Sequence, residues 1–406
     1  MACGTPSPCW RVRGRGRNSP LQHKWAAPTT IGATTIVEDR SDQPRSWRLI
    51  LSADVIAAVE SALSEFFAAR RPLVAAVGAD FADAVTDLEQ FVLRGGKRLR
   101  PSFAWTGWLG AHGDPDSADA EPVLRTCAAL ELVQACALIH DDIIDSSRTR
   151  RGYPTVHVAH AHRHADAGWR GDSAQFGQGV AILLGDLALA WADDMVRESG
   201  LSAEAAERLG PVWSAMRTEV LAGQFLDLNA VASGDESLDA ALRINRYKTA
   251  AYTVERPLHI GAALAGADQA LIDAYRAYGT DVGIAFQLRD DLLGVFGDPD
   301  VTGKPSGDDL REGKRTALYA IGLQRADEQD PATAKLLRAS LGADLSEPEV
   351  QQLRGVLSEL GAVAEIESRI TELTTTAITV IDRSSATEPV KRRLRDMAAS
   401  ATARTS

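Results

Sequence analysis

The sequence of 406 residues lacks paired cysteines and any apolar run long enough to cross a membrane. Its four cysteines form no CxxC pair, which argues against a zinc site or a disulfide framework and favours a reducing, cytoplasmic location. The most apolar stretch, from Val180 to Trp191, contains Asp186. It is too short and too polar for a transmembrane helix, and we expect none.

Basic residues are outnumbered by acidic ones. The chain has 44 lysines and arginines and 55 aspartates and glutamates, for a formal net charge of −11. This acid excess argues against nucleic acid as a partner. A polyanionic substrate remains compatible with it, since acidic side chains recruit divalent metal ions that bind phosphates. The charge is uneven: residues 1–50 carry a net +5, which leaves −16 on residues 51–406.

The first 36 residues contain no acid and are rich in Pro, Gly, Ser, Thr and Arg without helical periodicity. We therefore expect residues 1–50 to be a disordered basic extension. Arg-rich, acid-poor leaders can act in targeting, but no apolar segment follows, so a secretory signal is not expected. No Pro/Gly linker divides the remainder, and residues 51–400 are predicted to form one domain.

From about residue 51, apolar residues recur at three- and four-residue steps, which is typical of amphipathic helices. The alternation expected of strands is nearly absent, so the fold class is predicted to be all-α. The clearest helical segments are 124–144, 180–196, 205–228, 244–264, 271–296 and 351–381. Breaks are expected at 95–96, 110–122, 151–179, 233–237 and 297–314.

Two acidic clusters interrupt apolar helical stretches. Asp141 and Asp145 are one turn apart, with Asp142 between them, so on a helix the outer two share a face. Two carboxylates in this arrangement suit Mg²⁺, which takes its other ligands from water and from a substrate phosphate. The second cluster contains Asp290 and Asp291, and Gly294 occupies the position of a third acid.

Basic residues alternate with these acidic clusters along the chain. A glycine turn at 95–96 permits close backbone approach, and the cations that follow it suit a phosphate group. The alternation predicts two anion sites, one bridged by metal ions and one held by side-chain cations. The cations concerned are Lys97, Arg98, Arg100, Arg150, Arg151, Lys248, Lys304 and Lys314.

With these motifs in this order, the chain resembles the trans-prenyltransferases, also called polyprenyl or isoprenyl diphosphate synthases. The resemblance covers about residues 60–400 and implies the isoprenoid synthase fold, a bundle of antiparallel helices around a central cavity, assembled as a homodimer. The matching segments are DDIID at 141–145, RRG at 150–152, DDLLG at 290–294, GGKRLRP at 95–101, Lys248–Thr249, Phe286–Gln287 and residues 303–316.

The resemblance also implies a reaction, in which isopentenyl diphosphate condenses with dimethylallyl, geranyl or farnesyl diphosphate. Mg²⁺, or alternatively Mn²⁺, would bind Asp141, Asp142, Asp145 and Asp290. The expected ligands of the allylic diphosphate are Arg150, Lys248, Thr249, Gln287, Lys304 and Lys314. Those of isopentenyl diphosphate are Lys97, Arg100 and Arg151, and Gln134 is a further expected substrate-binding residue. The residues expected to act in catalysis are Asp141, Asp145, Arg150, Lys248 and Asp290.

Two positions and one segment differ from the family pattern. Gln134 stands where many members have histidine, and it keeps a hydrogen-bond donor, so binding should survive. Gly294 is expected to weaken one metal contact without inactivating the protein. The segment from Arg151 to Gly179 holds four histidines between 157 and 164, which we expect to lie in a partly ordered loop rather than a metal site, since no cysteine or carboxylate pair accompanies them.

Product length in this family depends on side chains one turn before the first acidic cluster. Here these are Cys136 and Ala137, both small, and a helical turn of about 5.4 Å corresponds to roughly one isoprene unit. Aromatic side chains there would stop growth at fifteen carbons. The sequence therefore favours geranylgeranyl diphosphate, with a farnesyl or longer polyprenyl diphosphate as alternatives.

Two other kinds of protein fit these motifs less well. A class I terpene cyclase needs neither a second diphosphate site nor a second Asp–Asp cluster, and Lys97, Arg100 and Asp290–Asp291 argue against it. A non-catalytic partner subunit would be marked by loss of the first acidic cluster or of Lys97, and both are intact.

Overall fold

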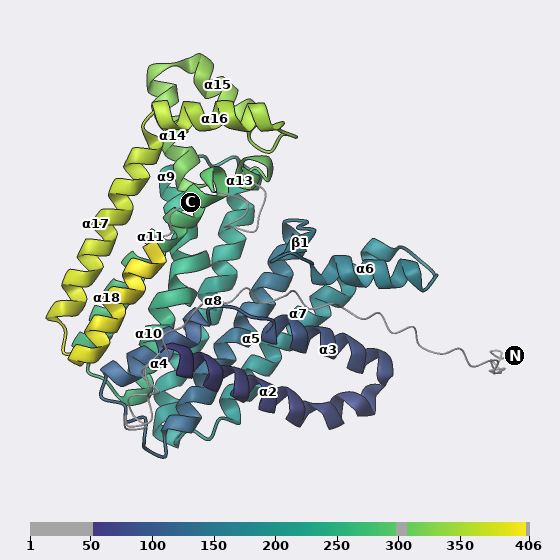
Figure 1. Ribbon diagram of the computed structural model, residues 1–406, viewed down its shortest axis with the longest axis vertical. Coiled ribbons are helices and arrows are strands. Elements are labelled where there is room, and N and C mark those ends of the chain that lie inside the picture. Colours follow the sequence, from purple (N-terminus) through teal and green to yellow (C-terminus); the bar gives the residue numbers. More distant parts are fainter. Residues whose placement is uncertain (1–51, 298–306, 403–406) are drawn as a thin grey trace, which may run out of the picture. The chain divides into compact units, whose positions relative to one another are not determined.

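The computed structural model describes residues 52–297 and 307–402, and nearly all of them are helical (Figure 1). The helices before residue 200 are α2 (Ser52–Val77), α3 (Ala79–Leu93), α4 (Leu99–Gly110), α5 (Ala120–Ile144), α6 (Val156–Asp166) and α7 (Ser173–Arg197). Those that follow are α8 (Ala203–Ser233), α9 (Leu238–Ile244), the π-helix η1 (Asn245–Glu255), α10 (Arg256–Ala265), α11 (Gln269–Phe296), α13 (Asp308–Arg311), α14 (Ala317–Gln329), α15 (Pro331–Ser340), α16 (Glu347–Glu359), α17 (Ala362–Arg383) and α18 (Glu388–Thr402).

Strands are confined, in the described ranges, to the two-residue pair β1 (Thr149–Arg150) and β2 (Tyr153–Pro154). They form an antiparallel hairpin in which Arg150 pairs with Tyr153. Arg151 and Gly152 make the turn with positive φ angles of 54° and 78°. The all-α prediction is therefore confirmed, and the one hairpin lies directly after the first acidic cluster.

Buried apolar residues form two clusters, and α11 belongs to both. The larger cluster joins α2 to α8 with η1, α10, α18, the first part of α11 and the last part of α17, and includes Trp105 and Tyr278. The smaller cluster lies among α9, the last part of α11 and α13 to α17. Figure 1 shows α11 running alongside α17 and α18 toward the end of the bundle formed by α13 to α16. The C-terminal part of α11, which carries the second acidic cluster, is thus packed within the smaller core.

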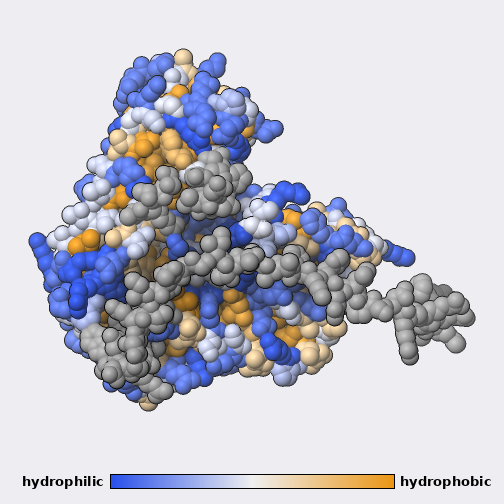
Figure 2. Space-filling view, in the orientation of Figure 1, coloured by the Kyte–Doolittle hydropathy of each residue, from blue (hydrophilic) through white to orange (hydrophobic). Residues whose placement is uncertain are grey.

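Helix α5 is apolar over most of its length before the acidic cluster and is largely buried. It is the one helix in the described part of the chain that is long and apolar enough to span a membrane, a property that the sequence analysis did not identify in it. Because 67% of its most apolar 18-residue segment is buried inside the bundle, it has the character of a core helix. The face of the molecule shown in Figure 2 is mostly hydrophilic, with separate apolar patches.

Two element predictions were wrong. The loop expected over residues 151–179 contains the whole of α6, and α7 begins within it at Ser173. Asp172 starts α7 by accepting a hydrogen bond from the Gln175 amide, a capping signal that the sequence analysis overlooked. The single helix expected over 351–381 is two helices, because Gly361 adopts a left-handed φ of 72° between α16 and α17.

Candidate active site

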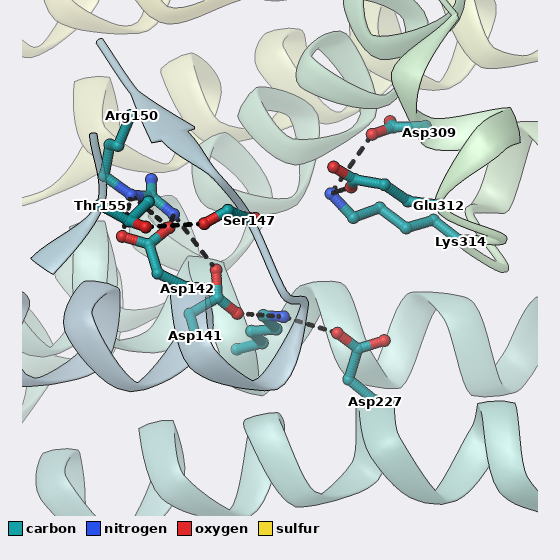
Figure 3. Close-up of polar contacts among 10 residues, drawn as sticks. Asp141, Asp142, Ser147, Arg150, Thr155, Asp227, Asp309, Glu312 and Lys314 are labelled. Carbon is teal, nitrogen blue, oxygen red and sulfur yellow. Dashed lines mark hydrogen bonds and ion pairs between the residues drawn. The ribbon is translucent and has the colours of Figure 1, made fainter. Parts of the chain in front are cut away.

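Helix α5 ends in the first acidic cluster. Asp141 and Asp142 lie in its last turn, and Asp145 is its C-terminal cap. The C-terminal end of a helix dipole is electronegative, so carboxylates there need nearby cations. The β1–β2 hairpin supplies one: Arg150 donates from Nε and Nη2 to Asp142, at 2.9 and 2.7 Å, and lies 3.5 Å from Asp141 (Figure 3). Asp142 is only 1% exposed and is fully engaged in holding Arg150.

A second cation approaches from the π-helix η1. Lys248 Nζ lies 3.1 Å from Asp141 Oδ1 and 2.5 Å from Asp227 Oδ2 on α8. The close approach of η1 to α8 depends on Gly223, where a Cβ atom would lie 2.3 Å from the Lys248 amide nitrogen. A π-helix within a longer helical run often marks a functional position, because it displaces side chains from the α-helical register. Here it directs Lys248 between two carboxylates.

The adjacent residue of η1 connects to the second acidic cluster. Thr249 Oγ1 donates to Gln287 Oε1 at 2.7 Å, and Gln287 Nε2 donates to Asp291 Oδ1 at 2.8 Å. Asp290 and Asp291 lie on α11, and Asp291 is buried with 3% exposure. Hydrogen bonds thus join Thr249 and Gln287, both predicted to bind the allylic diphosphate, to Asp291 of the second acidic cluster.

The place of the missing third acid is filled from another segment. A Cβ atom at Gly294 would lie 1.9 Å from Asp309 Oδ2, so the absence of a side chain at Gly294 leaves room for the Asp309 carboxylate. Lys314 lies 3.4 Å from Asp309 and 2.7 Å from Glu312 (Figure 3). The loss of an acid at 294 is therefore accompanied by an acid from α13.

The carboxylates of the site differ in how strongly their environment favours ionisation. Burial and the neighbouring Asp141 raise the pKa of Asp145 to about 6. Burial raises the pKa of Asp291 to about 7. Burial would also raise the pKa of Asp141, but Lys248 and Arg150 outweigh it and hold that pKa below its ordinary value. Asp145 and Asp291 thus lack sufficient compensating charge, which is the condition a bound cation would relieve.

A cationic pocket lies beside the first acidic cluster, between the end of α3, the middle of α5 and the hairpin. Arg150 lines this pocket while bonding Asp142, so it separates the pocket from the acidic cluster. Burial, Arg150 and Arg98 lower the pKa of Arg151, as expected where guanidinium groups crowd together. The lining residues are Phe91, Val92, Arg94, Arg98, Glu131, Gln134, Ala135, Leu138, Arg150, Arg151, Tyr153 and Pro154.

Two further residues predicted to bind isopentenyl diphosphate come from the glycine turn between α3 and α4 and from the first turn of α4. Lys97 is exposed on the glycine turn. Arg100 is buried, donates to Thr253 Oγ1 at 2.9 Å, and lies 4.0 Å above the ring of Tyr252. Neither lines the pocket itself, although Arg100 is close enough to lower the pKa of Arg151. The turn is fixed by Arg98, which donates to Glu131 and to the carbonyl of Val92.

The two residues predicted to limit product length differ in their surroundings. Cys136 is buried, and its Sγ lies 3.7 Å from His140 Nδ1. His140 in turn contacts α7, where a Cβ atom on Gly185 would lie 2.2 Å from the imidazole. Cys136 therefore faces α7. Ala137, one turn before Asp141 on the same face of α5, is partly buried.

Some predicted features lie elsewhere or outside the described residues. Lys304 belongs to the latter group. The histidines expected in a loop lie on α6, where His160 is 3.3 Å from Asp87 and His164 bonds the carbonyl of Arg170. Among residues 52–297 and 307–402, no three His, Cys, Asp or Glu side chains are arranged to hold a metal ion by themselves. A cation at the acidic clusters would need ligands from water or substrate, as Mg²⁺ commonly does.

Asp227 and Asp309 were not predicted from the sequence as site residues. Asp227 is one of several acids on the long helix α8, and its partner Lys248 is 21 residues away in the chain. The Gly-Gln-x-x-Asp segment at 223–227 was the available signal, since Gly223 permits the helix contact and Asp227 follows one turn later. Asp309 was recognised only as one residue of the segment 303–316 that matches the family, and nothing local relates it to Gly294.

Comparison with known proteins agrees with this geometry. The sequence model of the polyprenyl synthetase family matches residues 84–356, which include both acidic clusters and the cationic pocket. The chain belongs to this family. It is a prenyltransferase that makes a polyprenyl diphosphate, and its fold is the all-α isoprenoid synthase fold.

Individual relatives span several product lengths. The chain is 35% identical to a geranylfarnesyl diphosphate synthase of Aeropyrum pernix over 68% of this chain and 79% of the relative. It is 36% identical to a geranylgeranyl diphosphate synthase of Mycobacterium tuberculosis over 63% and 66% of the two chains. The crystal structure of a geranylgeranyl pyrophosphate synthase from Corynebacterium glutamicum, complexed with isoprenyl diphosphate and magnesium, has a TM-score of 0.85 and 49% identity, covering 87% of this chain and all of that one.

Proposed function

We propose that the chain is a Mg²⁺-dependent synthase that condenses isopentenyl diphosphate with an allylic diphosphate to give geranylgeranyl diphosphate. The observation that carries the proposal is the double role of Arg150, which bonds Asp142 in the acidic cluster and lines the cationic pocket. Two diphosphate groups can therefore bind on either side of one hairpin. Such proximity supplies much of the advantage of an enzyme over reaction in solution.

The allylic diphosphate is assigned to the acidic clusters. Asp141, Asp145 and Asp290 are the proposed Mg²⁺ ligands, whereas Asp142 is proposed to anchor Arg150 instead. The raised pKa values of Asp145 and Asp291 and the need for further ligands fit Mg²⁺, which binds through one or two carboxylates plus phosphate oxygens. When bound, the metal would neutralise charge on the departing diphosphate. Mn²⁺ would satisfy the same donors.

The side chains around the allylic site are proposed to stabilise the leaving group. Lys248, Arg150 and Lys314 supply positive charge where the diphosphate becomes more negative as the allylic C–O bond breaks. Thr249 donates to Gln287 Oε1 at 2.7 Å and so fixes the Gln287 amide, which keeps one N–H beyond its bond to Asp291 to donate at the same site. Lys304 is retained in this set from the sequence alone. No proton transfer is needed to start the reaction.

Isopentenyl diphosphate is assigned to the cationic pocket. Arg151 and Gln134 line it, Lys97 comes from the glycine turn beside it, and Arg100 comes from the first turn of α4. Its alkene would attack the allylic carbocation, and loss of a proton would complete the product. The carbocation requires apolar surroundings that exclude water, which the apolar helix α5 provides.

Geranylgeranyl diphosphate is the proposed product because the residue one turn before Asp141 is small. Ala137 leaves space for a chain longer than fifteen carbons, and Cys136 beside it is also small. The geranylgeranyl diphosphate synthases among the relatives support this length, while the geranylfarnesyl relative marks the nearest alternative.

The proposed assembly is a homodimer located in the cytoplasm. Six large apolar side chains are exposed on α7 and α8. Monomeric proteins rarely expose so many on consecutive helices, and a second copy of the chain would cover them. They are Ile182, Leu183, Leu221, Phe225, Leu228 and Val231. Cys127 and Cys136 are free thiols, in keeping with a reducing compartment. Light scattering of wild-type protein and of Leu183→Glu tests the dimer.

The deciding experiment incubates the protein with isopentenyl diphosphate, Mg²⁺ and each allylic primer in turn, followed by chromatography of the dephosphorylated products. A twenty-carbon all-trans product is expected, and its formation should stop on chelation of the metal. A cyclic hydrocarbon would indicate a terpene cyclase instead. Absence of product with every primer would favour a non-catalytic partner subunit and defeat the proposal.

A further inference from the structure

The four arginines that line the cationic pocket are not equivalent. Arg98 donates to Glu131 at 2.7 Å and lies 3.3 Å from Glu60, so its charge is neutralised within the protein. Arg150 is bonded by Asp142 at two positions. In the described part of the chain, Arg94 and Arg151 form no ion pair with a carboxylate. The pocket therefore presents two uncompensated guanidinium groups, and the sequence analysis identified only Arg151.

Arg94 is held at the pocket by an aromatic ring rather than by an acid. It caps the C-terminus of α3 immediately before the glycine turn, and its guanidinium lies 4.2 Å above the ring of Tyr153 on the opposite side, in β2. Within the described residues, the other polar contact of the Arg94 side chain is a long hydrogen bond of 3.3 Å to Gln90. Stacking on an aromatic face leaves the N–H groups at the edge of a guanidinium available to an anion.

The hairpin explains why Arg94 and Arg151 face one pocket. Tyr153 and Arg151 belong to the same β1–β2 turn, and Arg151 also reaches the glycine turn, with Nη1 3.4 Å from the carbonyl of Gly95. The two free cations thus come from opposite walls. Planar guanidinium groups on two sides of a pocket suit the oxygens of a diphosphate.

We propose that Arg94, positioned by stacking on Tyr153, is a further binding residue for the diphosphate group of the non-allylic substrate. This inference rests on the proposed function, since it assigns one more residue to the isopentenyl diphosphate pocket. Arg94 binds the substrate directly, and Tyr153 acts as a positioning residue that limits the conformations of Arg94 before the substrate arrives.

The test measures binding of isopentenyl diphosphate by titration calorimetry without metal, and steady-state kinetics with Mg²⁺. Arg94→Ala should weaken binding and raise the KM for isopentenyl diphosphate about tenfold, as expected for loss of one charge-assisted hydrogen bond. The KM for the allylic substrate and kcat should change little. Tyr153→Leu should give a smaller rise of about threefold, as expected for loss of a cation–π contact, and Tyr153→Phe should behave as wild type because it keeps the ring.

Arg71→Ala is the matched control, since Arg71 is an exposed arginine on α2 that pairs with Glu89 away from the pocket. Unchanged binding in Arg94→Ala, with wild-type protein binding normally, would overturn the inference and leave the proposed function intact. An equal weakening in Arg71→Ala would also overturn it, because the effect would then be one of general charge. If the wild-type protein neither binds isopentenyl diphosphate nor forms product, the proposed function itself has failed.

Discussion

The ammonium group of Lys248 lies 3.1 Å from the carboxylate of Asp141. It also bonds Asp227, so a single cation from a π-helix compensates two acids from α5 and α8. Burial lowers the pKa of Lys248, but these carboxylates outweigh burial and raise it above its ordinary value, so the side chain stays charged. A charged lysine in a partly buried acidic site is well suited to receive a diphosphate.

Replacement of Lys248 by alanine is expected to lower kcat/KM for the allylic diphosphate by about a hundredfold or more, as loss of a preorganised electrostatic group does in other sites. The KM for isopentenyl diphosphate should stay near its wild-type value, because Lys248 does not line the cationic pocket. Steady-state kinetics with each substrate varied in turn would measure both. Lys335→Ala, at an exposed position on α15, serves as the control. Equal losses for both substrates would contradict the assignment.

The pKa values of the acidic clusters predict that Mg²⁺ stabilises the protein more at high pH than at low pH. Asp145 and Asp291 have pKa values of about 6 and about 7, raised by burial above the ordinary value of 3.8. At pH values between the ordinary pKa and these raised pKa values, the folded protein holds more protons than the unfolded chain. The metal-free protein therefore loses stability as the pH rises through this interval. Mg²⁺ competes with these protons, and its binding should strengthen over the same interval.

Thermal unfolding with and without Mg²⁺, from about pH 5 to about pH 8, would measure this dependence. The rise in Tm caused by the metal should be small at the acidic end and large at the basic end. Asp145→Asn should make the metal-free protein more stable at the basic end and reduce the effect of the metal there. A Mg²⁺ effect that is independent of pH would be inconsistent with Asp145 as one of its ligands.

Substitution of Gly294 by alanine is expected to reduce activity about tenfold or more while preserving the fold. The added methyl group would lie 1.9 Å from Asp309 Oδ2, so the carboxylate must move away from α11 and from Lys314. Loss of a fixed charge near the transferred group commonly has such an effect. Activity assays and circular dichroism would separate the two outcomes.

Gly355→Ala is the control for helix effects in this experiment, because a methyl group there meets no atom within 4 Å. An alanine in place of a helical glycine should stabilise α16 by up to about 1 kcal/mol. Wild-type activity in Gly294→Ala would show that Asp309 has no part in the site.

Ala137→Phe is predicted to shorten the product from twenty to fifteen carbons. The phenyl ring would lie one turn from Asp141 on the same face of α5, where it would limit the space for a growing chain. Cys136→Phe was predicted from the sequence to act in the same way. Because Cys136 faces His140 and α7, its effect should be weaker and accompanied by a loss of stability of about 1–3 kcal/mol from overpacking. Chromatography of products and thermal unfolding distinguish the two, and unchanged product length in both would remove these residues as determinants.

Much of the site could be predicted because its signals are local. Asp141 and Asp145 show their shared face through helical spacing, and Arg150 and Arg151 follow them within a few residues. The fold class was predicted for the same reason, since helical periodicity is visible in any short window. Residues 151–179 were the main failure, because the capping role of Asp172 was overlooked and the polar, histidine-rich α6 has a weak apolar pattern.

The features of the site that were not predicted depend on contacts between segments that are distant in the sequence. Asp227 meets Lys248 only because Gly223 allows α8 and η1 to approach closely. The roles of the four pocket arginines could not be separated in the sequence, since Glu131 and Asp142 decide which of them are neutralised. The α-helical period of 244–264 gave no sign that its first half is a π-helix.

The π-helix η1 also affects how an enzyme of this family can lose its activity by mutation. Its hydrogen bonds close over five residues instead of four, so Asn245–Glu255 contains surplus chain relative to an α-helix of the same rise. A one-residue deletion within it could restore α-helical bonding, while turning Lys248 and Thr249 by about 100° relative to α10. The helix would persist and both side chains would leave the acidic clusters. This segment is therefore a position where an enzyme of this kind can lose its activity in one genetic step and keep its fold.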